Sequence, residues 1–375
     1  MCACLGALAL GLSGCSSTAS KSNSAVTVTG STLDVVATQP PGDPDQVDKD
    51  VLAGEQLALK HAGGKASPFT VDLRVAHGNE VSASARSAVE DKKAIAYLGE
   101  IAPGTSGVSL QITNQVGLLQ LSPTDTAIYL TQSTPAVSDS PDHYYPASGT
   151  FHRTFARVVP TTAQEAKALV AAMKARQVSK LYVADDGTDY GSSIADEIRQ
   201  DARAAGLTLA SASTGADGIF YGGVDGPSAA QALDRLAAAN PTAKVFAPSA
   251  LYDDSFVATL SPAAQKNLYV SAPGLPPRGQ SAAAKAFATA FQSTYGHAPQ
   301  PQAVYGYETM AALLAVLKGL GANANSRAKV VAAFRGLKDR QSVLGTYSLT
   351  SGDTNLASFV IAHPAGGRLV PRSSP

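Results

Sequence analysis

Short apolar runs alternate with alanine-rich helical patterns along most of this 375-residue chain, and this alternation constrains the fold more than any other feature. The first unit begins with an apolar run at 33–37, a helical pattern at 51–61 and a second apolar run at 71–76. Strands that alternate with helices form parallel sheets covered by helices on both faces. A continuous apolar run such as 118–121 is typical of a strand buried on both sides. The sequence therefore predicts an α/β fold built from doubly wound parallel sheets.

A long polar stretch rich in proline and serine, 124–150, separates this first unit from a second one. The alternation then restarts with a helix, which we expect to begin with a capping box at 162–165, and it continues to an apolar run at 245–247. Two such units in a chain of this length predict two lobes.

Two features of the later sequence depart from simple alternation. Fewer residues separate Leu209 from Gly218 than the dozen or so that a parallel crossover normally needs. We therefore expect the crossover helix to be missing there, and 207–211 not to be a regular strand. Three helical patterns near the end of the chain precede strand-like runs at 343–349 and 357–362, so we expect the chain to return to the first lobe and then cross again.

The composition excludes several classes of protein. Hydrophobic residues make up 45% of the chain and charged residues 15%, which is typical of a folded chain. The formal net charge is zero and no basic stripe carries interleaved aromatics, so we expect no nucleic-acid partner. Beyond the N-terminal run, no segment approaches 18 unbroken apolar residues, and we expect the mature chain not to cross the membrane.

No pattern of catalytic or metal-binding residues emerges. The six histidines are scattered without an HExxH motif, and the sequence contains no GxSxG elbow, Walker loop or GxGxxG. The three cysteines, Cys2, Cys4 and Cys15, all lie near the N-terminus, so we expect no thiol nucleophile in the mature chain. We therefore expect a non-enzymatic protein without a metal or other cofactor.

The N-terminus has the features of a lipoprotein signal. An uncharged apolar run from Leu5 ends in Leu12-Ser13-Gly14-Cys15, which matches a lipobox. We expect 1–14 to be a signal peptide, and 15–30 to be the lipidated Cys15 followed by a flexible tether. Acyl chains on Cys15 would hold the mature chain to the outer side of the cell membrane. No lysine or arginine precedes the run, which departs from the usual basic start of such a signal, and a start codon further upstream would account for this.

Three segments match a known family in order and spacing. The first contains AIAYLG at 94–99, PGTS at 103–106 and GLLQLSPTDT at 117–126; the second is LYVADDGTDYG at 181–191; the third is YGYE at 305–308. In these segments the chain resembles the type 1 periplasmic binding proteins, specifically the branched-chain amino-acid (Leu/Ile/Val) substrate-binding proteins of ABC transporters. The resemblance covers most of residues 30–365.

This resemblance implies two Rossmann-like lobes joined by three hinge crossings, near 151–160, 271–276 and 340–346. The ligand would bind in the cleft at the carboxyl ends of the strands, and closure of the lobes would bury it. The lobes that we expect are 31–153 with 275–341 for lobe 1, and 154–274 with 342–375 for lobe 2.

Several lobe 1 residues are candidates for ligand binding. A small zwitterion needs donors for its carboxylate, and the backbone N–H groups of Gly104, Thr105 and Ser106, between a predicted strand and helix, can provide them. The alternative is an ordinary turn with an N-cap. Thr124 and Asp125 precede Thr126, which matches the family's threonine that contacts the amino-acid head group.

Asp125 occupies a position that is usually small in the family. A carboxylate there would attract an amine or a polyhydroxy ligand and would repel a free carboxylate. The alternative is an Asx turn at the start of a loop.

The second lobe both matches and departs from the family. Tyr190 matches a tyrosine that contacts the ligand after closure, the alternative being an aromatic at the cleft edge without ligand contact. The family's glutamate for the ligand amine is replaced by Ser249, and Val224 and Asp225 stand where a cleft aromatic would follow Gly223. Recognition of an amine by that glutamate is therefore not transferable, and Asp125 or Asp225 is the candidate replacement.

The sequence predicts a lipid-anchored, extracytoplasmic solute-binding protein that captures a small polar ligand, such as an amino acid or amide, and delivers it to an ABC permease. We expect it to act as a monomer. The alternative is an anchored sensory module of the same fold whose closed form is read by a signalling partner.

Overall fold

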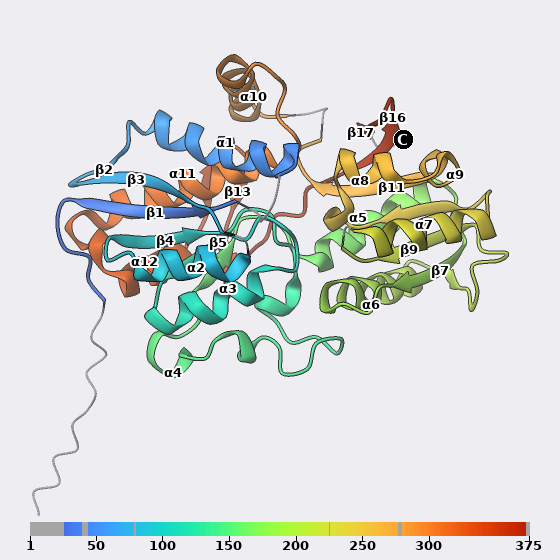
Figure 1. Cartoon of the computed structure of the whole chain (residues 1–375), viewed down its shortest axis with the longest axis horizontal. Coiled ribbons are helices and arrows are strands. Elements are labelled where there is room, and N and C mark those ends of the chain that lie inside the picture. Colours follow the sequence, from blue (N-terminus) through green and yellow to red (C-terminus); the bar gives the residue numbers. More distant parts are fainter. Residues whose placement is uncertain (1–25, 40–43, 79, 225, 277–279, 373–375) are drawn as a thin grey trace, which may run out of the picture.

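The computed structural model describes residues 26–39, 44–78, 80–224, 226–276 and 280–372, which form two α/β lobes lying side by side (Figure 1). The doubly wound α/β class is confirmed, because each lobe contains a largely parallel sheet with helices on its faces. None of the helices in these ranges has the length and apolar character needed to span a bilayer.

Lobe 1 is built on a six-stranded sheet in the order β2-β3-β1-β4-β5-β6. All neighbouring pairs are parallel except β2 with β3. Its strands are β1 Thr32–Thr38, β2 Lys65–Ala66, β3 Phe69–Ala76, β4 Ala94–Leu98, β5 Leu119–Ser122 and β6 Phe155–Arg157. Its helices are α1 Gln46–His61, α2 Val81–Glu90, α3 Ser106–Thr113, the short α4 Ser148–Phe151, α10 Ala282–Tyr295, α11 Ala303–Leu320 and α12 Arg327–Arg335.

Lobe 2 is built on a seven-stranded sheet in the order β17-β16-β11-β10-β9-β7-β8. The strands from β8 to β11 are parallel, whereas β16 and β17 are antiparallel to their neighbours. Its strands are β7 Lys180–Asp185, β8 Thr208–Leu209, β9 Gly218–Gly222, β10 Lys244–Ala247, β11 Leu268–Pro273, β16 Phe359–Ala365 and β17 Arg368–Arg372. Its helices are α5 Thr162–Ala175, α6 Asp189–Ala204, α7 Pro227–Ala239, α8 Asp254–Thr259 and α9 Pro262–Lys266.

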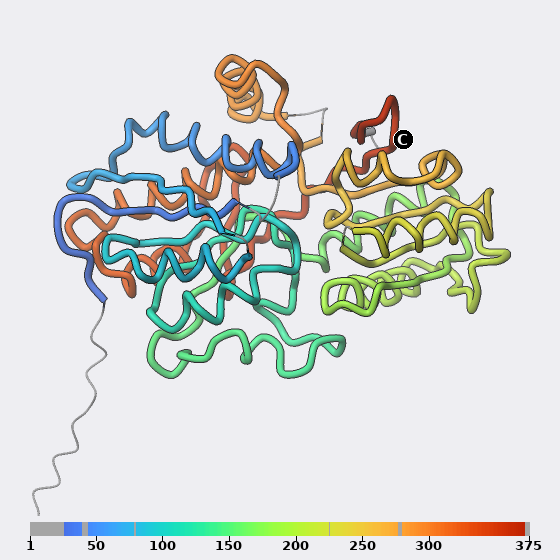
Figure 2. Tube along the Cα trace, viewed as in Figure 1, coloured from blue at the N-terminus to red at the C-terminus, as the bar shows by residue number. Residues whose placement is uncertain are grey.

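The chain passes between the two lobes three times (Figure 2). The first passage follows β6, which still pairs with β5 in lobe 1, and the second lies between β11 and α10. The third comes later than the expected 340–346, because Tyr347 and Leu349 pack in the lobe 1 core and the chain joins the second sheet only at β16. The hairpins β12 Arg340–Ser342 with β13 Gly345–Tyr347, and β14 Leu349–Thr350 with β15 Asp353–Thr354, precede that passage.

The segment around Leu209 has the unusual connection that its short length predicted. No helix lies between β8 and β9. The expectation that 207–211 is not a regular strand needs a correction, since Thr208 and Leu209 pair with β7 at the edge of the sheet. An edge strand of two residues lets a short connection reach β9 on the other side of β7.

The start of α5 differs by one residue from the expected capping box. Thr161 is the N-cap and Gln164 completes the box, so the helix begins at Thr162. Because Gln164 and not Glu165 completes the capping box, the Glu165 side chain can point into the interior, where it is fully buried.

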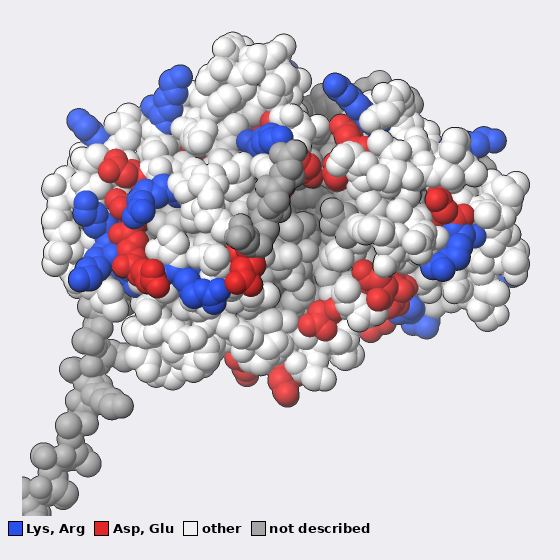
Figure 3. All heavy atoms as spheres, viewed as in Figure 1, with Lys and Arg blue, Asp and Glu red and all other residues white. Residues whose placement is uncertain are grey.

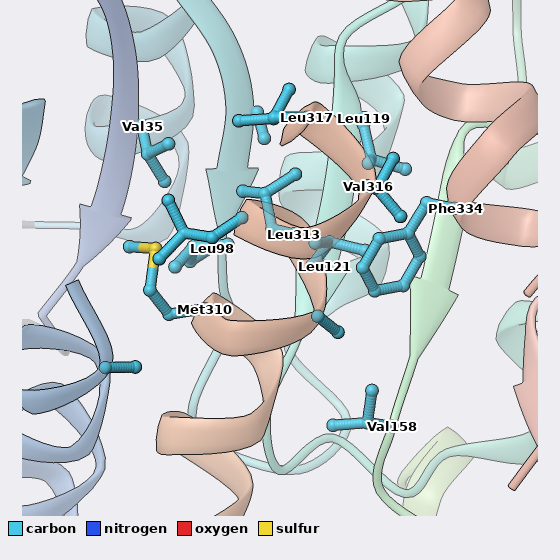
Figure 4. Close-up of a cluster of buried hydrophobic side chains, with 14 of the residues drawn as sticks. Val35, Leu98, Leu119, Leu121, Val158, Met310, Leu313, Val316, Leu317 and Phe334 are labelled. Atoms are coloured by element: carbon cyan, nitrogen blue, oxygen red, sulfur yellow. The ribbon is translucent and has the colours of Figure 1, made fainter. Parts of the chain in front are cut away.

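The lobe 1 core lies between the sheet and α11 and α12. Strand β4 is buried along its whole length, as its continuous apolar sequence predicted. Leu98, Leu121, Leu313 and Phe334 converge from the strands and the two helices (Figure 4). Burial of such side chains stabilises each lobe by about 1.5–3 kcal/mol per residue.

Glycines allow α1 and α11 to pack closely against each other. A Cβ atom added to Gly306 would lie 2.2 Å from the carbonyl oxygen of Val51, and one added to Gly54 would lie 2.3 Å from that of Ala303. Gly319, on the same helix as Gly306, has no atom within 4 Å of an added Cβ.

We expect Gly306→Ala to lower the free energy of unfolding by about 1–3 kcal/mol, because the new methyl group forces the two helix backbones apart. Gly319→Ala is the matched control, and alanine's helix propensity should raise that free energy by roughly 0.5–1 kcal/mol. Urea denaturation followed by circular dichroism measures both. Equal effects of the two variants would contradict this account of the packing.

Candidate ligand-binding cleft

Two cavities lie between the lobes, on either side of the loop that contains Pro103. The acidic cavity, named for Asp45, Asp48 and Asp253 in its lining, has a volume of about 400 Å³. The tyrosine cavity, named for Tyr129, Tyr144 and Tyr190, has a volume of about 410 Å³. Both volumes fall in the usual range for small-molecule sites. In Figure 3, acidic side chains gather beside the junction of the two lobes.

The expected site residues are divided between these cavities. Thr124 and Ser249 line the acidic cavity, from lobe 1 and lobe 2 respectively. Gly104, Thr105 and Tyr190 line the tyrosine cavity. Asp225 and the lipidation candidate Cys15 lie outside the described residues.

Tyr190 connects the two lobes at the centre of the cleft. It lies in the first turn of α6, and its hydroxyl oxygen lies 3.2 Å from Thr126 Oγ1, which follows β5 of lobe 1. The same oxygen lies 3.4 Å from Ser249 Oγ and 3.5 Å from Glu165 Oε2. Burial raises the pKa of Tyr190 well above its ordinary value, so the phenol stays protonated and can donate a hydrogen bond.

The sequence analysis missed Glu165, which anchors the lobe 2 side of this cluster. Its carboxylate accepts hydrogen bonds from the Ser249 backbone N–H at 2.6 Å, from Ser249 Oγ at 3.1 Å and from Ser271 Oγ at 2.6 Å. Burial raises the pKa of Glu165, and the bonds from the two serines oppose that rise. Placing the capping box at Thr161 and Gln164 would have revealed Glu165, because its side chain then falls on the buried face of α5.

The Asp125 side chain points into lobe 1 and accepts hydrogen bonds from backbone N–H groups there. Its Oδ1 accepts hydrogen bonds from the N–H groups of Gly104 at 2.8 Å and Ala127 at 3.0 Å, and its Oδ2 accepts one from Ser106 at 3.0 Å. The residue has no exposed surface. The bond to Ala127 is that of an Asx turn, which was the alternative interpretation.

This arrangement corrects two expectations about the loop at 104–106. The N–H groups of Gly104 and Ser106, expected to bind a ligand carboxylate, already bind the carboxylate of Asp125. The N–H group of Thr105 donates to the carbonyl of Ala102. Asp125 in turn is not presented to a ligand amine, because its oxygens face the protein's own donors.

A glycine is needed at position 104 for the lobes to meet. Gly104 has a φ of +84°, and an added Cβ would lie 3.0 Å from Tyr190 Cβ. Tyr129 donates to the Gly104 carbonyl from the lobe 1 side at 3.3 Å. A larger residue would therefore strain the backbone and separate Tyr190 from Thr126.

A buried arginine fixes the segment that carries Asp125 and Thr126. Arg157 Nη1 donates to the carbonyl oxygens of Asp125 at 3.0 Å and Ala127 at 2.7 Å. Its Nε pairs with Asp353 Oδ1 at 2.8 Å, and its Nη2 donates to Thr131 Oγ1 at 2.8 Å. The side chain of Arg157 is fully buried, so these bonds replace its hydration.

Glu100 is a second buried carboxyl group close to the loop. Burial raises its pKa from 4.5 to about 7, although a hydrogen bond from the Tyr97 hydroxyl at 2.6 Å opposes that rise. Asp125 adds a smaller repulsion that also raises this pKa. Within the described ranges, no group of three or more histidine, cysteine or acidic side chains is placed to hold a metal ion.

The chain is similar to known periplasmic binding proteins in sequence pattern and in fold. The model of a family described as periplasmic binding protein matches residues 41–359. The leucine-binding protein LivK of Thermotoga maritima superposes with a TM-score of 0.73 at 17% identity, over 91% of this chain and 97% of the other. A substrate-binding protein of Desulfitobacterium hafniense in complex with Leu gives 0.73 at 19% identity, over 91% and 100%.

A third structure widens the range of bound molecules. A solute-binding protein of R. palustris in complex with benzoate superposes with a TM-score of 0.68 at 17% identity, over 91% of this chain and 96% of the other. A sequence search of curated proteins finds no match. At these identities the structural likeness is evidence for the fold.

The raised pKa of Glu100 predicts that the stability of the protein depends on pH. The unfolded carboxyl ionises near 4.5 and the folded one near 7, so the folded state holds the proton more tightly between these values. Stability should therefore fall as pH rises from about 4.5 to 7, by roughly 3 kcal/mol at about 1.4 kcal/mol per unit of pKa shift. Glu100→Gln keeps an acceptor for Tyr97 but should lose this contribution to the decline.

Urea denaturation at pH 4.5, 6 and 8 tests the prediction, with the difference between wild type and Glu100→Gln as the measured quantity. Using the difference removes other groups that titrate in this window, such as Glu197, whose pKa burial also raises to about 7. Parallel pH profiles for the two proteins would contradict the prediction.

Proposed function

Because the chain belongs to the type 1 periplasmic binding protein family, we propose that it is a lipid-anchored solute-binding protein that delivers a small polar ligand to an ABC importer. The observation that carries this proposal is the pair of cavities lined by both lobes, with the Thr126–Tyr190 contact joining the lobes. A ligand in either cavity would touch both lobes, so it would favour the conformation in which they meet.

The relatives support a small ligand without specifying which one. The Desulfitobacterium protein was solved with leucine and the R. palustris protein with benzoate, so the same fold accommodates an amino acid and an aromatic acid. In this chain Ser249 binds the buried Glu165 instead of presenting a glutamate to the cleft. The ligand class must therefore be argued from this chain's own residues.

The first test asks whether a ligand binds in the acidic cavity. Amino acids, amides, polyamines and sugars are screened by thermal melting of the lipidated protein in detergent, followed by circular dichroism. A ligand at 100 times its Kd should stabilise the protein by about 2.7 kcal/mol. Ala250→Trp should abolish that gain, because Ala250 lines the cavity.

Ala238→Trp, on the exposed side of α7, is the control and should keep the gain. Cells that carry Ala250→Trp should also lose uptake of the compound that the wild type binds. Ligand stabilisation that survives in Ala250→Trp would contradict binding in this cavity.

The second test concerns the anchor. The lipobox places the lipid on Cys15, so labelling of cells with a palmitate analogue should mark the wild-type protein and not Cys15→Ala. Cys4→Ala is the matched control, because it removes a nearby cysteine and leaves the lipobox intact. Retained label on Cys15→Ala would overturn the assignment.

A further inference from the structure

We propose that the cleft selects an uncharged polar ligand, such as a primary amide, over the corresponding carboxylate, because the protein's own carboxyl groups occupy the donors that an anion needs. This inference rests on the proposed function and names the ligand class of the same cleft. Three observations carry it: backbone donors at the cleft are already bound, both cavity linings lack a cationic side chain, and the partners of Asp125 all lie in one lobe.

The Asp125 carboxylate occupies the donors at the start of α3. It accepts hydrogen bonds from the N–H groups of Gly104 at 2.8 Å and Ser106 at 3.0 Å. The Thr105 N–H, between them, donates to the carbonyl oxygen of Ala102 at 3.3 Å. The N-terminus of a helix is where backbone N–H groups commonly hold an anion. In this chain the anion held there is a side chain, so a ligand carboxylate would find these donors taken.

Two carboxyl groups of lobe 2 occupy backbone donors in the same way. Glu165 accepts a hydrogen bond from the Ser249 N–H, which follows β10, at 2.6 Å. Asp186 Oδ2 accepts one from the Val224 N–H, which follows β9, at 3.0 Å. Ser249 lines the acidic cavity and Val224 lines the tyrosine cavity. Each cavity therefore has, on its lobe 2 side, a residue whose N–H group already binds an internal carboxyl group.

Neither cavity offers a cationic side chain to an anion. Among the described residues, no lysine, arginine or histidine lines the acidic cavity or the tyrosine cavity. Arg157 binds the Asp125 carbonyl oxygen, but its side chain has no exposed surface and pairs with Asp353. A carboxylate removed from water is costly unless a cation or several donors balance its charge. Binding of a carboxylate ligand is therefore disfavoured in either cavity.

The charge of Asp125 also reaches the lining of the tyrosine cavity. Burial raises the pKa of Tyr129 above its ordinary value, and repulsion by Asp125 raises it further. The pKa of Tyr144 is raised by burial and by repulsion from Asp189 and Asp125. Charges that oppose ionisation of these phenols also oppose an anionic ligand beside them. Both hydroxyl groups stay protonated, and an uncharged ligand would not meet this repulsion.

The bonds of Asp125 do not depend on closure of the cleft. All three N–H groups that bind its carboxylate belong to lobe 1, as Asp125 itself does. Opening of the lobes would break the contact between Thr126 and Tyr190, but it would leave these three bonds in place. A ligand that approaches an open cleft therefore meets the same occupied donors.

Uncharged groups remain available for recognition of a ligand. Thr105, Gln111 and Tyr144 contribute polar groups to the tyrosine cavity, beside the exposed side chain of Val108. A primary amide has nearly the shape of a carboxylate, but it carries N–H donors in place of one anionic oxygen. It can therefore form hydrogen bonds without bringing a charge that this cleft leaves unbalanced.

The experiment compares molecules that differ only in this group. The starting pairs are 3-methylbutanamide with 3-methylbutanoate and benzamide with benzoate. Each compound that stabilises the protein in the thermal screen is added beside its analogue with amide and carboxylate exchanged. Isothermal titration of the lipidated protein in detergent at pH 7.5 should give the amide at least about tenfold tighter binding than the acid, because burial of the acid leaves its charge unbalanced.

Asp125→Ala tests the internal carboxylate. It frees the N–H groups of Gly104 and Ser106, so the ratio of amide affinity to acid affinity should fall by about fivefold or more. Sodium formate should raise the melting temperature of this variant more than sodium chloride at equal ionic strength, because formate can bind the freed donors. The wild type should respond equally to the two salts. Asp125→Asn keeps one acceptor and should give an intermediate ratio, which provides the measurement if the alanine variant fails to fold.

Asp50→Ala is the matched control. Asp50 is also a buried carboxyl group that binds a backbone donor, the Gln300 N–H at 2.8 Å, but it lines neither cavity. This variant should lower the melting temperature and leave the affinity ratio at its wild-type value. An equal fall in the ratio would show that loss of stability alone changes selectivity, and it would overturn the inference.

The outcomes separate this inference from the proposed function. Tighter binding of the amides, with a ratio that falls in Asp125→Ala but not in Asp50→Ala, would support both. Tighter binding of the acids by the wild type, or a ratio unchanged in Asp125→Ala, would overturn the inference and leave the solute-binding function standing. If no compound in the wider screen bound to the cleft, both would be overturned.

Discussion

The structure of the cleft depends on the buried guanidinium of Arg157. It pairs with Asp353 and donates to the carbonyl groups of Asp125 and Ala127, at the point where the chain leaves lobe 1. An arginine without exposed surface is tolerated only when such bonds replace its hydration, and removing one partner of a buried pair typically costs 3–5 kcal/mol. The segment that carries Asp125 and Thr126 is therefore fixed by β6 and β15 rather than by a ligand.

The fixed position of Asp125 also orders the loop that lies between the two cavities. With its backbone fixed, Asp125 presents its carboxylate to the N–H groups of Gly104 and Ser106, and this loop in turn contacts Tyr190. The fold matches that of amino-acid-binding proteins, but the donors at this helix start are already saturated. A likeness of fold therefore does not transfer the ligand, because ligand choice depends on a few side chains and not on the arrangement of the sheets.

The sequence predicted most of the fold, because alternating apolar runs and helical faces reflect burial that each segment carries locally. It also selected Thr126, Tyr190 and Ser249, which the structure brings together around one hydroxyl group. It did not predict the direction of the Asp125 side chain, because that depends on donors about twenty residues away that only the folded loop aligns. Glu165 was missed through a shift of one residue in the capping box.

Binding and closure are coupled because the candidate cavities belong to both lobes. Thr126 of lobe 1 and Tyr190 of lobe 2 meet across the cleft, and residues of both lobes line each cavity. A ligand in either cavity would contact both lobes, so it would bind the arrangement in which they meet more tightly than one in which they are apart. A ligand shifts a conformational equilibrium only by such a difference in affinity.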